Sequence, residues 1–250
     1  MRSSRQDAGK RLPVLFDIDG TLLLSSRVGY RAMLEAAGHM VGRPVTLTGV
    51  DFAGRLDPEI WAGIAGLNEI ENAASREAEF RASYTSILAR MVREDDIVQL
   101  LPGVSDLVQR LRNDGAVTLG LLTGNYPETG LLKIRAAGLD PRDFPVAAWG
   151  CDGNSRRDLP RVAMRRYAEK FGRPIPPNRV LVIGDTPIDI DCARANGCVA
   201  LGVATGPSYS LGDLQASLPD LAVSDLADTE YLVSWILSRG SCHGMEPAAE

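Results

Sequence analysis

The sequence predicts an α/β fold, a Rossmann-like parallel sheet core with helices on both faces, plus an inserted block of helices. Two patterns carry this prediction. Beyond Leu101, short apolar runs alternate with helical patterns, which is the order typical of a parallel sheet covered on both sides. Between about residues 26 and 98, by contrast, the periodicity is helical and no strand pattern occurs.

Composition and charge limit the classes of function. The 250 residues include 45% hydrophobic and 24% charged residues, the ordinary globular range. A net charge of −5 argues against a general nucleic-acid binder, and no apolar stretch approaches the roughly 18 residues that span a membrane. The four cysteines have no metal-ligand spacing, and the polar start lacks a secretory apolar segment. We therefore expect a cytoplasmic protein without a nucleic-acid or membrane partner. Its oligomeric state, monomer or homodimer, stays open.

The first strand is expected at the apolar run Val14-Leu15-Phe16, between Pro13 and Gly20. Two carboxylates, Asp17 and Asp19, follow it directly. Acids at the end of a buried strand are costly to desolvate, so they favour a bound cation. The alternative is an ordinary Asp-x-Asp-Gly turn.

The inserted block contains three helical patterns. The first covers 28–41, and the second begins at Asp57, with Asp57 as its N-cap and Pro58 at its first position. The third covers 75–92, with Ser75 as its cap. After the boundary at 101–104, we expect helices at 105–113, 127–137, 159–171, 188–195, 211–218 and 228–237, and strands at 116–122, 146–149, 179–183, 199–203 and 221–223.

Polar side chains follow three of the predicted strands. Because ligands of parallel sheets bind beyond the carboxyl ends of the strands, we expect these residues to form one site. The first cluster is Asp17, Asp19 and Thr21, the second is Thr123, Gly124 and Asn125, and the third is Gly184, Asp185, Thr186 and Asp189.

This residue set suits phosphoryl transfer. Asp17, Asp19 and Asp185 offer the hard oxygen ligands that Mg²⁺ prefers. A carboxylate can act as the nucleophile, and a second acid can protonate a leaving alkoxide and then activate water. The Thr123 hydroxyl and the amides of Gly124 and Asn125 can hold phosphate oxygens. A cation is also expected, and two arginines, 156 and 157, precede the helix predicted at 159–171.

These motifs together resemble the haloacid dehalogenase (HAD) superfamily, in its phosphoglycolate phosphatase-like branch with a helical cap. The first motif is FDIDGTL (16–22), the second is LLTGN (121–125) and the fourth is VIGDTPID (182–189). The third motif normally supplies a Lys, whereas the matching NSRRDL (154–159) offers Arg. We align Arg157 with that Lys, and Arg156 stays open as the alternative.

The resemblance implies a role for each matching residue. Asp17 would be the nucleophile and Asp19 the general acid/base, an acid that dehalogenases lack and that therefore favours phosphate esters. Mg²⁺ would be held by the side chains of Asp17 and Asp185 and by the Asp19 carbonyl, with Asp189 in support. Phosphate would contact Thr123, Gly124, Asn125 and Arg157.

The resemblance also implies an organisation. It divides the chain into a core of 12–25 and 99–238 and a cap of 26–98. From the residues themselves we expect a disordered leader (1–11) and a disordered tail (239–250). Arg55 in the cap loop would contact an anionic group of the substrate, a solvated loop residue being the alternative. Small phosphorylated metabolites, phosphoglycolate first, are the expected substrates of a Mg²⁺-dependent phosphatase.

Two other functions stay open from the sequence. A sugar phosphomutase similar to β-phosphoglucomutase would use the same first and fourth motifs. A catalytically silent HAD fold would serve as a binding module, although the intact Asp17, Asp19 and Asp185 argue against it.

Overall fold

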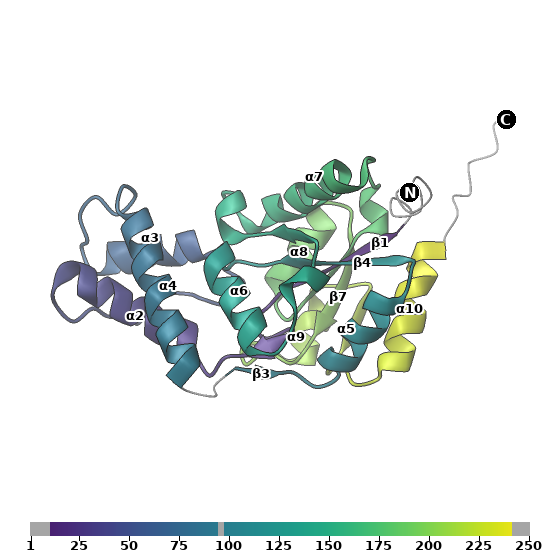
Figure 1. The fold of residues 1–250 in the computed structure, drawn as a ribbon, viewed down its shortest axis with the longest axis horizontal. Helices are drawn as coiled ribbons and strands as arrows, with labels where there is room; N and C mark the ends of the chain where they lie inside the picture. Colours follow the sequence, from purple (N-terminus) through teal and green to yellow (C-terminus); the bar gives the residue numbers. More distant parts are fainter. Residues whose placement is uncertain (1–10, 95–97, 242–250) are drawn as a thin grey trace.

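The computed structural model describes residues 11–94 and 98–241, and it confirms the α/β fold. The sheet of the core (Figure 1) has six strands, all parallel. Their order is β5-β4-β1-β6-β7-β8. A separate antiparallel pair joins β2 to β3. The strands are β1 (Leu12–Phe16), β2 (Leu23–Leu24), β3 (Gln99–Leu100), β4 (Val117–Leu122), β5 (Val146–Ala148), β6 (Leu181–Gly184), β7 (Val199–Val203) and β8 (Leu221–Val223).

The first strand lies in the middle of the sheet. β1 pairs with β4 on one side and β6 on the other, and all five of its residues are buried. Such burial is typical of a parallel strand covered on both faces. Because strand side chains alternate, Phe16 belongs to one apolar cluster and Leu15 to the other.

Helices cover both faces of the sheet. Residues of α5 and α10 belong to the cluster around Phe16, and residues of α7 and α8 belong to the cluster around Leu15. The helices of this part are α5 (Val104–Asn113), α6 (Pro127–Ala136), α7 (Leu159–Phe171), α8 (Pro187–Ala195), α9 (Leu211–Ala216) and α10 (Thr229–Ser241). Short 3₁₀ helices are η1 (Pro141–Asp143), η2 (Gly150–Asp152), η3 (Arg156–Asp158) and η4 (Pro177–Arg179).

The helices α2 (Val28–Val41), α3 (Asp57–Leu67) and α4 (Glu77–Glu94) lie together at one end of the molecule (Figure 1). We call these helices and the loops between them, residues 28–94, the helical insert. They have an apolar cluster of their own, in which the rings of Trp61 and Phe80 stack with centroids 4.3 Å apart. The β2–β3 pair joins the segment that precedes α2 to the segment that follows α4. The insert contacts α6 through the ion pair between Arg81 and Glu128, at 2.8 Å.

Several expected element ends differ from the structure. The helix expected at 211–218 ends at Ala216, and the strand expected at 179–183 begins at Leu181 because Arg179 belongs to η4. Asp57 is the first residue of α3 rather than its cap, and its carboxylate accepts hydrogen bonds from Tyr126 N (2.8 Å) and Thr129 Oγ1 (3.3 Å). The third inserted helix begins at Glu77 instead of residue 75. The last helix continues to Ser241, past the predicted start of the tail at 239.

Residues 1–10 of the predicted leader and 242–250 of the predicted tail lie outside the described residues. Within the described part of the chain, no helix has the length and apolar character needed to cross a membrane.

Candidate active site

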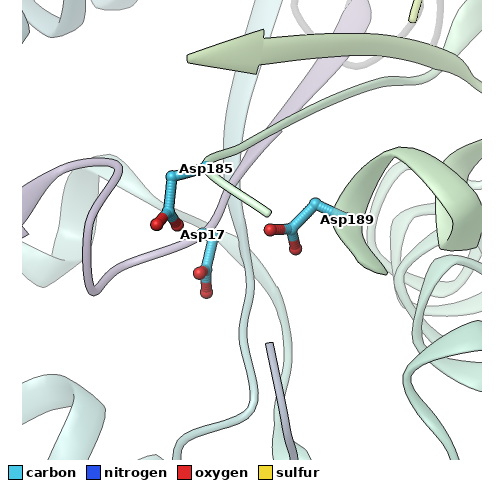
Figure 2. Close-up of side chains that lie close together, drawn as sticks. All are labelled: Asp17, Asp185 and Asp189. Carbon is cyan, nitrogen blue, oxygen red and sulfur yellow. The ribbon is translucent and has the colours of Figure 1, made fainter. Parts of the chain in front are cut away.

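Three buried carboxylates meet beyond the carboxyl ends of β1 and β6. Asp17 follows β1, Asp185 follows β6, and Asp189 lies in the first turn of α8 (Figure 2). One oxygen from each lies within 4.8 Å of the others. The arrangement follows from the sheet, because β1 and β6 are neighbouring parallel strands whose ends share one edge.

A glycine allows this close approach. Gly20 has a φ of +83°, and a Cβ at this position would lie 2.3 Å from Asp185 Oδ2. Thr21 beside it donates a hydrogen bond of 3.3 Å to Asp185 Oδ1. The glycine and threonine of the first motif thus position the acid of the fourth.

Arg156 is the cation among these carboxylates. It is buried, and its Nη2 lies 3.0 Å from Asp17 Oδ1 and 2.5 Å from Asp189 Oδ1. Its Nη1 donates a hydrogen bond of 3.3 Å to the Gly54 carbonyl in the helical insert. Arg156 therefore joins the sheet edge to the insert.

Arg157, which we aligned with the Lys of the third motif, does not lie beside Asp17, so that alignment is wrong. Arg157 is exposed, and it pairs with Asp191 on the outer side of α8 at 2.6 Å. Both arginines lie in the 3₁₀ turn η3, where successive side chains point about 120° apart. Only one of them can therefore face Asp17, and their order in the sequence does not tell which.

Asp19 lies outside the carboxylate cluster and has its own partners. Its Oδ2 accepts hydrogen bonds from Lys133 Nζ (2.6 Å) and Asn125 Nδ2 (2.9 Å), and its Oδ1 accepts one from Ser25 (3.2 Å). Lys133 also donates to Asn125 Oδ1 at 2.7 Å. The Asp19 side chain is thus held toward α6.

Sequence reasoning missed Lys133. It lies on the buried face of α6 with Thr129, Gly130 and Ile134. A lysine at this helical spacing, on an otherwise small and apolar face, is the signal that could have found it, because buried lysines are rare unless paired.

The loop after β4 also forms part of the site. Thr123 and Asn125 are buried, and Asn125 Nδ2 donates to Thr123 Oγ1 at 2.8 Å. A Cβ on Gly124 would lie 2.0 Å from the Arg55 carbonyl, so only glycine fits here. The Gly124 carbonyl accepts a hydrogen bond from Asp57 N at 2.7 Å, which holds the loop against the insert.

Burial and charge perturb the carboxylates in opposite directions. Burial raises the pKa of Asp17 to about 6, although Arg156 opposes the shift, and burial raises the pKa of Asp185 well above its usual range. For Asp19, burial is outweighed by the Lys133 ammonium and its hydrogen bonds, so the pKa lies below its usual value. Asp19 therefore ionises more readily than Asp17.

The carboxylate cluster fits a divalent cation. Three buried acids face a single guanidinium, that of Arg156, so the negative charge of the cluster exceeds the positive charge beside it. Unbalanced, oxygen-rich surroundings of this kind suit Mg²⁺, which binds through one or two carboxylates and keeps water as its other ligands.

A cavity of about 600 Å³ lies over these residues. Its lining combines Asp17, Asp19, Asp185 and the loop after β4 with side chains of the helical insert. Arg55 lines it too, but its guanidinium is exposed and donates to Asp51 Oδ2 at 3.1 and 3.2 Å. Of the residues predicted to contact metal or substrate, the cavity is lined by Asp17, Asp19, Arg55, Thr123, Gly124, Asn125 and Asp185. Arg157 and Asp189 are not among its lining residues, although Asp189 lies in the carboxylate cluster beside it.

Comparisons with known proteins find relatives in sequence and in fold. The chain is 26% identical to the phosphoglycolate phosphatase of Escherichia coli (strain K12), covering 86% of this chain and 89% of the relative. A hydrolase structure from Pseudomonas syringae matches with a TM-score of 0.67 at 20% identity, covering 90% of this chain and 99% of its own.

A β-phosphoglucomutase structure from Clostridium difficile matches with a TM-score of 0.66 at 16% identity, covering 91% of this chain and 98% of its own. Both structures are similar in fold. The haloacid dehalogenase-like hydrolase family matches residues 14–197, which include all three carboxylates and both arginines of the third motif. The chain therefore belongs to the haloacid dehalogenase-like hydrolase family.

Proposed function

We propose that this protein is a Mg²⁺-dependent phosphatase that hydrolyses a small phosphomonoester through an aspartyl-phosphate on Asp17. The observation that carries the proposal is the buried Asp17 carboxylate, which lies within a cluster of acids and 3.0 Å from Arg156, under a cavity of ligand size. Membership in a hydrolase family supports the reaction class.

Asp17 and Asp185 would hold Mg²⁺ by their side chains, together with the Asp19 carbonyl. Asp189 would support them from α8, where its second oxygen accepts hydrogen bonds from Thr186 N and Oγ1 at 3.0 and 2.7 Å. When bound, Mg²⁺ neutralises charge on the acids and on the phosphoryl oxygens, so that an anionic nucleophile can approach an anionic substrate.

The protein groups divide the reaction between them. Asp17 attacks phosphorus and the ester P–O bond breaks, while Asp19 gives its proton to the leaving alkoxide. Asp19 then takes a proton from the water that attacks the aspartyl-phosphate, which releases phosphate and regenerates Asp17. Arg156 holds Asp17 in place and neutralises charge on the phosphoryl group, and Thr123, Gly124 and Asn125 bind its oxygens.

Lys133 is the group that orients the acid/base residue. Its contact of 2.6 Å with Asp19 favours the ionised carboxylate, which is the form that activates water in the second step. Substrate binding must then supply the protonated form for the first step.

We also propose that the chain divides into a core (12–25 and 99–238) and a cap (26–98) that covers the substrate and excludes water. The contacts of Asp57 with α6 and of Arg156 with Gly54 support a closed arrangement. Phosphoglycolate is the first substrate to test, because curated relatives of the chain act on it by name.

The test is hydrolysis of p-nitrophenyl phosphate with and without Mg²⁺. We expect turnover that EDTA abolishes and that Asp17→Asn lowers by at least about a thousandfold, since removal of a nucleophile costs that much or more. A folded, Mg²⁺-loaded protein without turnover would contradict the proposal. Turnover that depends on a sugar bisphosphate activator would instead support the phosphomutase alternative.

A further inference from the structure

The helical insert and β2 give the cavity an apolar wall. The motif residues provide its polar part, and the rest of the lining is rich in large hydrophobic and aromatic side chains. Those of the wall are Leu24, Tyr30, Met33, Phe52, Ile60 and Tyr84.

Two members of this wall are open to solvent. Tyr30 is 37% exposed and Leu24 is 40% exposed, and they are two of the five large hydrophobic side chains that are exposed in the described chain. The Tyr30 ring lies against the Phe52 ring, with centroids 5.2 Å apart and planes inclined by 50°. Exposed apolar groups that line a concave site are usually covered by the ligand.

Three of the cations that line the cavity already pair with carboxylates of the protein. Lys133 and Arg156 contact carboxylates of the site, and Arg55 is held by Asp51. Arg27, in a left-handed turn with φ of 59° before α2, lies beside the apolar wall. A guanidinium there can stack on a flat ring as well as bind a charge.

The size of the cavity also favours a substrate larger than phosphoglycolate. A volume of about 600 Å³ is within the range that holds ligands of drug size. A two-carbon acid ester such as phosphoglycolate would occupy the polar part and leave Tyr30 and Phe52 uncovered.

We propose that the phosphoester hydrolysed at this site carries an aromatic or similarly flat apolar ring on its leaving-group oxygen, bound against Tyr30 and Phe52. This inference rests on the phosphatase activity proposed above. The bond that breaks is the same P–O ester bond, so no further reactant is required.

The experiment compares benzyl phosphate with ethyl phosphate. Both leave as primary alkoxides of similar basicity, so the ratio of their kcat/KM values reports the contact of the ring with the pocket. We expect the wild-type protein to prefer benzyl phosphate by at least about tenfold, because even one buried methylene discriminates by about 10–200-fold.

Two variants test whether the preference for benzyl phosphate depends on Tyr30 and Phe52. Tyr30→Ala and Phe52→Ala should each lower the ratio of the two kcat/KM values several-fold. Tyr231→Ala is the matched control, because Tyr231 is 48% exposed on α10 and is not among the cavity-lining residues, so it should leave the ratio unchanged.

The outcomes separate the two proposals. Absence of Mg²⁺-dependent hydrolysis of either ester would contradict the phosphatase proposal itself. Hydrolysis of both esters with a ratio near one, or a ratio that survives both alanine variants, would overturn only the ring-bearing substrate. A higher kcat/KM for phosphoglycolate than for benzyl phosphate would overturn it as well.

Discussion

Replacing Arg156 tests which arginine serves the site. Arg156 is 5% exposed, and one of its nitrogens contacts both Asp17 and Asp189, at 3.0 and 2.5 Å. Arg156→Met removes the only cation that contacts these two acids among the described residues and leaves buried negative charge uncompensated. Breaking a buried pair in this way costs about 3–5 kcal/mol, so the urea midpoint of the metal-free protein should fall strongly.

The effect on catalysis should be larger for Arg156 than for its neighbour. Loss of a preorganised donor to the phosphoryl group lowers kcat by about 10²–10³-fold, and we expect a loss of that size for Arg156→Met. Arg157→Met is the matched control, because Arg157 is exposed and its guanidinium pairs with Asp191 on the outer side of α8. It should keep both the urea midpoint and kcat/KM close to the wild-type values.

The assay is urea unfolding in EDTA combined with steady-state hydrolysis of p-nitrophenyl phosphate with Mg²⁺. If Arg156→Met does not fold, Arg156→Lys keeps the charge and should recover stability, with lower kcat/KM because Lys lacks the planar guanidinium. Equal losses in the Arg156 and Arg157 variants, or wild-type kcat/KM in Arg156→Met, would refute the assignment of Arg156.

Three further predictions follow from the site. Gly20→Ala should lower kcat/KM by at least about a hundredfold, because its Cβ would displace Asp185. Gly138→Ala is the control, because Gly138 has a similar φ of +82° and open space around it. This control should lower only the free energy of unfolding, by about 1 kcal/mol. Burial raises the pKa of Asp57 in the folded protein to about 6 from 3.8, so the free energy of unfolding of the wild type falls as pH rises through that interval. Relative to the wild type, the free energy of unfolding of Asp57→Asn should therefore increase by up to about 3 kcal/mol between pH 4 and pH 6, as measured by urea unfolding. A difference that does not vary with pH would contradict this. Lys133→Met should lower kcat for ethyl phosphate by about 10–100-fold through misplacement of Asp19, with unchanged kcat as the contrary result.

Local patterns were sufficient for much of the fold. The bounds of α2, α7, β7 and β8 agree with the predicted ranges, because apolar periodicity and flanking glycines and prolines act over a few residues. The convergence of Asp17 and Asp185 was also predictable, since parallel strands that alternate with helices bring their carboxyl ends to one edge.

Contacts between distant segments were beyond those patterns. Asp57 looks like an N-cap in the sequence, yet its carboxylate accepts a hydrogen bond from Tyr126 N at the start of α6, 69 residues further along the chain. Lys133 looks like a surface residue, yet it lies 114 residues from the acid that it orients, Asp19.

The sequence by itself therefore determined the class of fold and the carboxylates of the site, because these depend on periodicity and on residues at strand ends. The tertiary structure decided that Arg156 rather than Arg157 faces Asp17, and that Lys133 holds Asp19. The physical reason is that side-chain direction in η3 and α6 depends on how each turn packs against the sheet and the helical insert, which no local pattern contains.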